Sequence, residues 1–162
     1  MMIGIVSDTH DHVPHIKQAV QIFKDRNIDV VIHAGDYCSP FTIPHFKGLS
    51  LHGIFGNNDG DHYLLMQKFE AINATLHGFF CELKIDNRLF AVYHGTNQPI
   101  TDALRNCGKY DGEISGHTHK VVNHRIGNTL ALNPGSAHGF EEKATIALLD
   151  TNKMQPEFVE LS

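Results

Sequence analysis

Cysteine is scarce in this chain of 162 residues. Its three cysteines, Cys38, Cys81 and Cys107, are widely spaced and form no CxxC pair. Such a set is typical of reduced thiols and argues against a disulfide framework or a zinc finger. Long hydrophobic runs are also lacking, since runs such as 89–93 are far too short to cross a bilayer. The chain does not begin like a signal peptide. We therefore expect a cytoplasmic protein with no membrane partner.

The sequence also lacks clusters of Lys and Arg. The 13 Lys and Arg residues are outnumbered by 18 Asp and Glu, and the formal net charge is −5. A surface that binds duplex nucleic acid needs a patch of Lys and Arg, so we expect no such partner. There is no low-complexity segment or evident repeat. The composition, 41% hydrophobic and 19% charged, is typical of a globular chain, and the length favours one domain over 1–162.

The pattern of apolar residues predicts alternating strands and helices in the first half and mainly strands in the second. Strands are expected at 2–6, 30–32, 51–55, 79–85, 88–93, 112–115, 121–126, 129–132, 143–149 and 154–160. Helices are expected at 14–26, within 40–47, at 61–72 and at 98–107. The early βαβαβ order implies parallel strands with helices packed against them. We expect an α/β fold of four layers, an α/β/β/α sandwich in which two mixed sheets pack face to face with helices outside.

Histidine is abundant, with 13 residues, and it is a common metal ligand and proton carrier. Seven candidate metal ligands follow predicted strands directly: Asp8, His10, Asp36, Asn57, His94, His117 and His119. Loops at the carboxyl ends of parallel strands converge on one rim of an α/β sheet, where ligands bind. Each residue alone has an ordinary explanation as a turn or core residue, although the pair His117 and His119 favours metal binding. Together the seven positions indicate a metal site.

These motifs resemble a known family. Asp8-Thr9-His10, Gly35-Asp36, Gly56-Asn57, His94-Gly95 and Gly116-His117-Thr118-His119 match, in order, the five motif blocks of the calcineurin-like metallophosphoesterases. The short length and the SDTHDH opening are similar to the small YfcE-type phosphodiesterases. Any single block is weakly specific, whereas the ordered set is highly specific. The resemblance extends over nearly the whole chain, including the loop 133–136.

The resemblance implies two divalent transition-metal ions. One ion would take Asp8, His10 and His119, the other Asn57, His94 and His117, and Asp36 would bridge them. Imidazole and oxygen ligands without thiolate suit Mn²⁺, Ni²⁺, Fe, Co²⁺ or Zn²⁺ better than Ca²⁺, and we expect Mn²⁺. The family implies attack on phosphorus by a hydroxide that bridges the ions. Asp36 is therefore a candidate catalytic residue as well as a ligand.

Asn58 departs from the family pattern. Many members have a histidine at this position that assists the leaving group, and asparagine cannot release a proton by changing its charge state. We keep Asn58 as a candidate catalytic residue because of its position. His12 and His138, in loops near the same rim, are candidate substrate-binding residues, and His62 lies nearby. His33 is expected to be a core residue close to the site.

The expected function is hydrolysis of a small phosphodiester substrate. A phosphomonoesterase is the nearer alternative, because a metal pair does not itself require a second ester group. The other alternative is a protein-binding scaffold of the retromer-subunit type. Loss of ligand residues would favour the scaffold, and all seven are present here. A homo-oligomer is compatible with the sequence.

Overall fold

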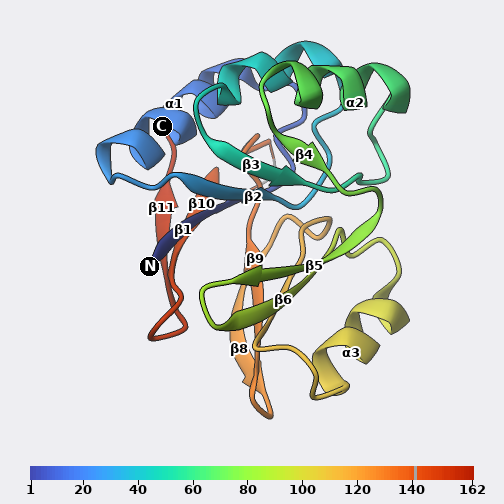
Figure 1. Ribbon diagram of the computed structural model, residues 1–162, viewed down its shortest axis with the longest axis vertical. Coiled ribbons are helices and arrows are strands. Elements are labelled where there is room, and N and C mark those ends of the chain that lie inside the picture. Colours follow the sequence, from blue (N-terminus) through green and yellow to red (C-terminus); the bar gives the residue numbers. More distant parts are fainter. Residues whose placement is uncertain (141) are drawn as a thin grey trace.

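A computed structural model describes residues 1–140 and 142–162 of the chain. Two mixed β-sheets pack face to face (Figure 1). The six-stranded sheet, in the order β11-β10-β1-β2-β3-β4, consists of β1 (Met2–Val6), β2 (Val30–His33), β3 (Ser50–Gly53), β4 (Thr75–Leu76), β10 (Thr145–Asp150) and β11 (Gln155–Glu160). The five-stranded sheet, in the order β5-β6-β7-β9-β8, consists of β5 (Phe80–Ile85), β6 (Arg88–Tyr93), β7 (Gly112–Ile114), β8 (Val121–Ile126) and β9 (Thr129–Pro134).

Helices cover the outer sides of both sheets, which confirms the predicted four layers. The elements α1 (Val13–Asp25), the 3₁₀ helix η1 (Pro40–Phe46) and α2 (His62–Ala71) lie over the six-stranded sheet (Figure 1). Helix α3 (Gln98–Asn106) lies on the other sheet, against β7 and β9. None of the helices in the described part of the chain has the length and apolar character of a membrane span.

Some local predictions differ from the structure. The third strand, expected at 51–55, ends at Gly53. The short helix near 40–47 is of the 3₁₀ type, and Pro44 inside it has no backbone N–H to continue an α-helical ladder. The strand β4 was not predicted, because two residues carry no readable alternation. None of these differences moves a candidate ligand away from a strand end.

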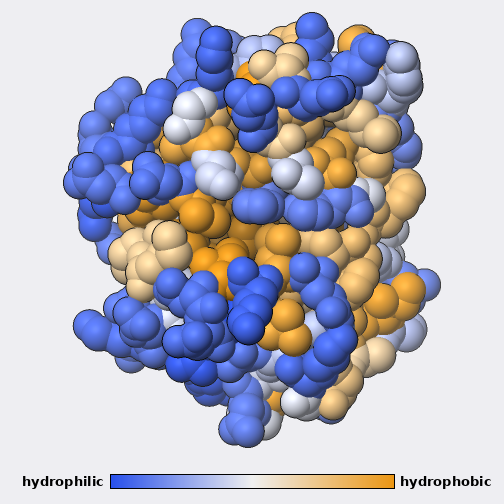
Figure 2. Space-filling model, viewed as in Figure 1, coloured by the Kyte–Doolittle hydropathy of each residue, from blue (hydrophilic) through white to orange (hydrophobic). Residues whose placement is uncertain are grey.

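The apolar core has two parts, one on each face of the six-stranded sheet. In β10, Ile146 and Leu148 pack beneath the helices, whereas Ala147 and Leu149 pack between the two sheets. This alternation follows from the two-residue period of a strand, and burial of both faces is typical of the central strands of α/β folds. Figure 2 shows apolar atoms gathered in a band across the middle of the molecule, with hydrophilic atoms above and below.

Parallel pairing brings the loops after several strands to one edge. β1 pairs with β2, β2 with β3, and β6 with β7, all in parallel. Backbone bonds continue beyond the strands, since Asp8 N donates to Gly35 O (3.0 Å) and Gly116 N to His94 O (2.9 Å). The two rims meet where His117 N donates to Asp8 Oδ2 (3.1 Å). The site therefore lies at the junction of both sheets.

Helix α3 is attached to its sheet through a buried ion pair. Arg105 Nε donates to Glu113 Oε2 (2.7 Å), and Arg105 Nη2 donates to Ser115 Oγ (3.1 Å). Glu113 is fully buried, and the Arg105 side chain is 11% exposed. Burial raises the pKa of Glu113, while the charge of Arg105 acts in the opposite direction. The pair therefore depends on both partners being present.

We expect Arg105→Ala to lower the free energy of unfolding by about 3–5 kcal/mol at neutral pH, because it leaves a buried carboxylate without its cation. Since burial raises the pKa of Glu113, the folded state favours the protonated acid, and the loss should shrink as the pH falls to about 5. Urea unfolding at both pH values measures this. The matched control, Arg105→Ala with Glu113→Gln, should recover much of the loss. A loss independent of pH and unchanged in the double variant would contradict the interpretation.

Candidate metal centre

The loops of the site turn sharply at the ends of their strands. Five of the seven candidate ligands have left-handed backbone angles: Asp8 (φ 52), His10 (φ 38), Asp36 (φ 61), His117 (φ 65) and His119 (φ 58). Residues other than glycine rarely adopt this conformation, and each instance costs on the order of 1–3 kcal/mol. Strain of this kind gathers where a site needs a particular side-chain direction. Here the left-handed turns direct side chains from the ends of separate strands into one cluster.

The carboxylate of Asp8 lies at one side of the cluster. It is fully buried and accepts hydrogen bonds from Ser7 Oγ (2.5 Å) and from His117 N (3.1 Å). His119 Nε2 lies 3.3 Å from Asp8 Oδ1, and His10 Nε2 lies 3.8 Å from the same oxygen. His94 Nε2 lies 3.9 Å from it. Asp8 therefore faces three imidazoles, from the loops after β1, β6 and β7.

The carboxylate of Asp36 lies at the centre of the cluster. His94 Nε2 is 3.3 Å and His10 Nε2 is 3.5 Å from Asp36 Oδ2. Asn58 holds both oxygens in place, since its N–H donates to Oδ1 (2.9 Å) and its Nδ2 donates to Oδ2 (2.8 Å). The side chain of Asn58 thus orients a carboxylate, a role that its position in the sequence did not indicate.

The residues present fit a metal ion. His10 Nε2 and His94 Nε2 are buried and have no hydrogen-bond partner among the described residues. His94 Nδ1 lies 2.7 Å from Ala34 O, so it donates to that carbonyl, and in the neutral ring the lone pair is on Nε2. Two atoms that each lie about 2.1 Å from one ion are about 3–3.5 Å apart. The separations of 3.3 and 3.5 Å around Asp36 match that spacing.

The charges of the cluster are complementary. Burial alone would raise the pKa of Asp8, but His10 and His119 outweigh it and hold that pKa well below its usual range. Burial would also raise the pKa of Asp36, but His94 and Asn58 outweigh it and lower that pKa. Conversely, burial would lower the pKa of His94, and Asp36 and Asp8 raise it. Both carboxylates are thus kept ionised, as metal ligands must be.

The other candidate ligands and binding residues differ in how closely they join the cluster. The ring of His117 lies 5.3 Å from that of His94. Asn57 is exposed, and its Oδ1 accepts from Thr96 Oγ1 (3.5 Å). His12 Nδ1 accepts from His15 N (3.3 Å), which caps α1. The structure therefore places His117 at the cluster, and Asn57 and His12 at its edge.

His138 lies deeper in the site than its sequence position indicated. Its ring centroid is 4.7 Å from that of His10 and 4.6 Å from that of His119. One ligand atom from each of these three residues falls within 4.8 Å of the others, as do ligand atoms of Asp8, His10 and Asp36. Phe140 N donates to His138 Nδ1 (2.8 Å), which fixes the ring. His138 is thus a third imidazole beside His10 and His119.

Sequence reasoning missed two residues that hold the loops of the site. Asp59 accepts from Asp36 N (3.1 Å), Gly56 N (2.7 Å) and Cys38 N (2.9 Å), and so ties the loops after β2 and β3 together. Asn133 Nδ2 donates to Gly116 O (2.7 Å) and Thr118 Oγ1 (3.1 Å). The turn-like Gly-Asn-Asn-Asp run was the signal available for Asp59.

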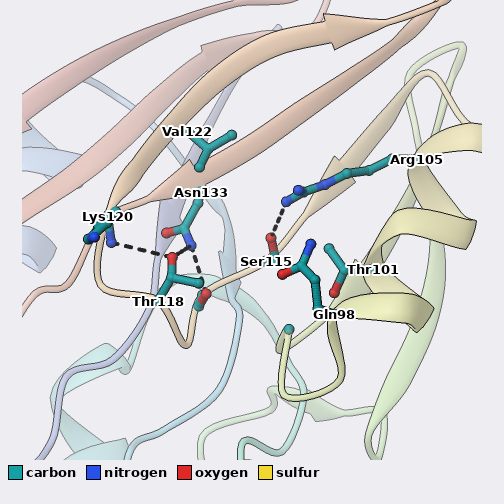
Figure 3. Close-up of a pocket in the computed structure, with 10 residues that line it drawn as sticks. Gln98, Thr101, Arg105, Ser115, Thr118, Lys120, Val122 and Asn133 are labelled. Carbon is teal, nitrogen blue, oxygen red and sulfur yellow. Dashed lines mark hydrogen bonds between the residues drawn. The ribbon is translucent and has the colours of Figure 1, made fainter.

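A cavity of about 240 Å³ lies behind the loop that Asn133 holds. Figure 3 shows Asn133 bonded to Thr118 on one side of it and Arg105 bonded to Ser115 on the other. Gly95 and Gly116 line this cavity, whereas the neighbouring ligands His94 and His117 do not. The cavity therefore adjoins the backbone of the ligand loops and not the ligand atoms.

His33 is a core residue, as expected. Its Nε2 lies 3.2 Å from Thr9 Oγ1, and its Nδ1 accepts from Gly35 N (3.2 Å). Burial lowers the pKa of His33 to about 3, so its ring is neutral. Cys38 Sγ lies 3.3 Å from His10 Nδ1, and burial raises the pKa of that thiol to about 12. Cys38 is thus a protonated thiol beside a candidate ligand.

Comparison with known proteins agrees with this geometry. The family model for the calcineurin-like phosphoesterase superfamily domain matches residues 1–154. A phosphodiesterase of Methanocaldococcus jannaschii is 40% identical over 159 residues, 96% of each chain. A solved archaeal phosphodiesterase has a TM-score of 0.95 at 38% identity, covering 99% of this chain and 100% of that one. The chain belongs to the calcineurin-like phosphoesterase superfamily, whose members use divalent metal ions.

More distant structures share the fold alone. The YfcE phosphoesterase of E. coli has a TM-score of 0.74 at 16% identity over the full length of both chains. Vps29 of Entamoeba histolytica, solved with Zn²⁺, has a TM-score of 0.69 at 23% identity and covers 99% of both chains. These likenesses confirm the two-sheet architecture and carry no argument about activity.

Gly56 provides a test of the metal centre through its lack of a side chain. A Cβ at this position would overlap Asp36 Oδ1, the oxygen that Asn58 N holds. Gly56→Ala should therefore displace the Asp36 carboxylate and weaken metal binding about 10- to 100-fold, as loss of an orienting contact does. Titration calorimetry with Mn²⁺ measures the affinity. The matched control is Gly60→Ala in the same loop, where a Cβ meets only Cys38 O at 3.6 Å. Equal Mn²⁺ affinity in the two variants would count against the role of Asp36.

Proposed function

We propose that this chain is a metal-dependent phosphodiesterase that hydrolyses small phosphodiesters. The observation that carries the proposal is the buried cluster in which His10 Nε2 and His94 Nε2 face the Asp36 carboxylate at 3.5 and 3.3 Å. The 40% identity to an archaeal phosphodiesterase supports the choice of diesters. A phosphomonoesterase, the alternative, has the same need for metal and is distinguished by the substrate test below.

The proposed ligand sets follow the cluster. Asp8, His10 and His119 would hold one divalent transition-metal ion, and Asn57, His94 and His117 would hold the other. Asp36 would be the residue shared by both sets, and its position opposite both His10 and His94 supports this role. The donor set of imidazole and oxygen favours Mn²⁺ and related ions over Ca²⁺. Asn57 Oδ1 accepts a hydrogen bond from Thr96 Oγ1 (3.5 Å), so this side chain would have to release that bond to become a ligand.

Neighbouring groups hold the candidate ligands in fixed orientations, and bound divalent ions would supply the chemistry. Such ions activate water as a nucleophile and neutralise charge on phosphoryl oxygens. Asn58 keeps the Asp36 carboxylate in one orientation through two hydrogen bonds. The Ala34 carbonyl accepts from Nδ1–H of His94 and so keeps the neutral ring in the tautomer whose Nε2 lone pair would bind a metal ion. His138, beside His10 and His119, is placed to contact a phosphoryl oxygen, and His12 lies at the outer edge of the same rim.

The scaffold alternative is less well supported. The solved Vps29 structures resemble this chain below 25% identity and so inform its fold alone. In this chain the buried carboxylates of Asp8 and Asp36 are ionised and surrounded by imidazoles. A docking surface does not need such an arrangement, whose burial is costly without a cation.

The purified protein should bind two divalent ions per chain and hydrolyse bis(p-nitrophenyl) phosphate. Removal of the ions with a chelator should abolish turnover, because the nucleophile and the charge neutralisation both come from them. Added Mn²⁺ should restore it. Release of p-nitrophenol is followed before and after chelation, with metal content measured in the same samples.

The matched substrate control is p-nitrophenyl phosphate, which releases the same chromophore from a monoester. Faster cleavage of the monoester would replace the diesterase with a phosphomonoesterase. Hydrolysis that continues at an equal rate in the metal-free protein would contradict the proposed mechanism.

Asn58 generates a prediction about the leaving group. Its amide is bonded to Asp36 and has no proton to release, so this position offers no general acid. Help from a general acid is worth about 10²–10⁴-fold, and its absence is felt most with basic leaving groups. The rate should therefore fall steeply along a series of aryl to alkyl diesters of rising leaving-group pKa. The measurement is kcat/KM across that series, with chemistry shown to be rate-limiting. A flat series would mean that another residue, such as His12 or His138, supplies the proton.

A further inference from the structure

A second cavity opens directly beside the metal centre. It has a volume of about 300 Å³ and is lined by Phe55, Gly56, Asn57, Phe79, Tyr93, His94 and Thr96. Asn57 and His94 are two of the proposed metal ligands, so the cavity and the metal centre share a wall. Its volume is at the lower end of the range for small-molecule sites, about 300–1,000 Å³. A ligand whose phosphate lay at the metal centre would therefore have this cavity beside the phosphate, next to Asn57 and His94.

The wall of this cavity is aromatic. Phe55, which follows β3, is stacked on His62 with ring centroids 4.0 Å apart. Phe79, in the segment between β4 and β5, lies 5.3 Å from Phe55 and 5.6 Å from His62. Tyr93, at the end of β6, is held by a bond from Asn97 N to its hydroxyl oxygen (3.1 Å). Three aromatic rings, those of Phe55, Phe79 and Tyr93, therefore line one cavity together with two proposed metal ligands.

Phe79 does not belong to the core. It is 58% exposed although it lies against two other rings, and its exposed surface lines the cavity. Exposed aromatic side chains that border a cavity are suited to stacking against a flat ligand ring, which contributes about 1–3 kcal/mol per base in nucleic-acid sites. A saturated alkyl group would gain burial but no stacking.

The net negative charge of the chain limits how much negative charge a ligand can carry. A formal net charge of −5 opposes binding of a long polyanion, whereas a single phosphate is accommodated by the metal centre. The cavity has room for one ring system beside that phosphate. A mononucleotide unit combines these features, because it carries one phosphate and one flat base.

We propose that the cavity lined by Phe55, Phe79 and Tyr93 binds the nucleobase of a nucleotide phosphodiester whose phosphate lies at the metal centre. The proposal rests on the proposed function and adds a substrate class to it. Phe79 is then a specificity residue that contacts the base, and Tyr93 lines the same cavity. The metal centre contacts the phosphate, and the aromatic cavity distinguishes nucleotides from other diesters.

The test compares two phosphate ligands that differ only in the base, adenosine monophosphate and ribose 5-phosphate. Titration calorimetry on the Mn²⁺-loaded protein gives a dissociation constant for each. Adenosine monophosphate should bind about 5- to 150-fold more tightly, which corresponds to one stacked base. Equal affinities, or absence of binding by adenosine monophosphate, would overturn the proposal.

Variants assign the preference to the cavity. Phe79→Ala should remove most of the advantage of adenosine monophosphate and leave the affinity for ribose 5-phosphate within about twofold, whereas Phe79→Tyr keeps a ring and should retain the advantage. The matched control is Phe41→Ala, since Phe41 is 56% exposed and lies on η1, outside the cavity. Loss of affinity for both ligands in Phe79→Ala, or an equal effect of Phe41→Ala, would contradict the assignment.

The outcome is separable from that of the proposed function. Diester hydrolysis with equal affinities for the two ligands would overturn the base-binding cavity and leave the phosphodiesterase standing. A base preference that depends on Phe79, in a protein without diesterase activity, would support the cavity and overturn the phosphodiesterase.

Discussion

Burial of two carboxylates at one point is the constraint on which the rest of this structure depends. Asp8 is fully buried and Asp36 is 1% exposed, and both keep their charge. Moving an ionised carboxylate out of water costs several kcal/mol unless partners replace the lost hydration. The partners here are imidazoles from the loops after β1, β6 and β7, together with N–H groups of Asn58 and His117. Divalent cations, which members of the superfamily use, would complete the balance of charge.

This arrangement is held by the layers around it. The left-handed residues of the ligand loops are strained, and such strain persists only where the surrounding structure leaves the chain no alternative. Asp59 joins the loops after β2 and β3, and Asn133 holds the loop after β7. The apolar clusters on both faces of the six-stranded sheet keep the strands in register. The packed core fixes the ends of the strands, and these ends fix the positions of the charged residues in the loops at the rim.

The two sides of the cluster differ in polarity. His10, His119 and His138 form a polar group of three rings near Asp8. On the side of Asn57 and His94 the wall is aromatic, with Phe55 and Phe79. A diester has one phosphate and two organic groups, so two chemically different walls allow the groups to be told apart. Asn58 binds the Asp36 carboxylate through two hydrogen bonds, and its amide has no proton to release.

The sequence by itself determined the class of fold and indicated candidate ligands at the ends of strands. Alternating apolar runs predicted the parallel strands, and polar residues directly after them identified Asp8, Asp36 and His94, because parallel strands share one rim. These signals are local in the chain. The tertiary structure alone decided that Asn58 binds Asp36, that Asp59 and Asn133 tie loops together, and that His138 lies beside His10. Such contacts join residues from separate loops through the packing of two sheets, which no periodicity along the chain records.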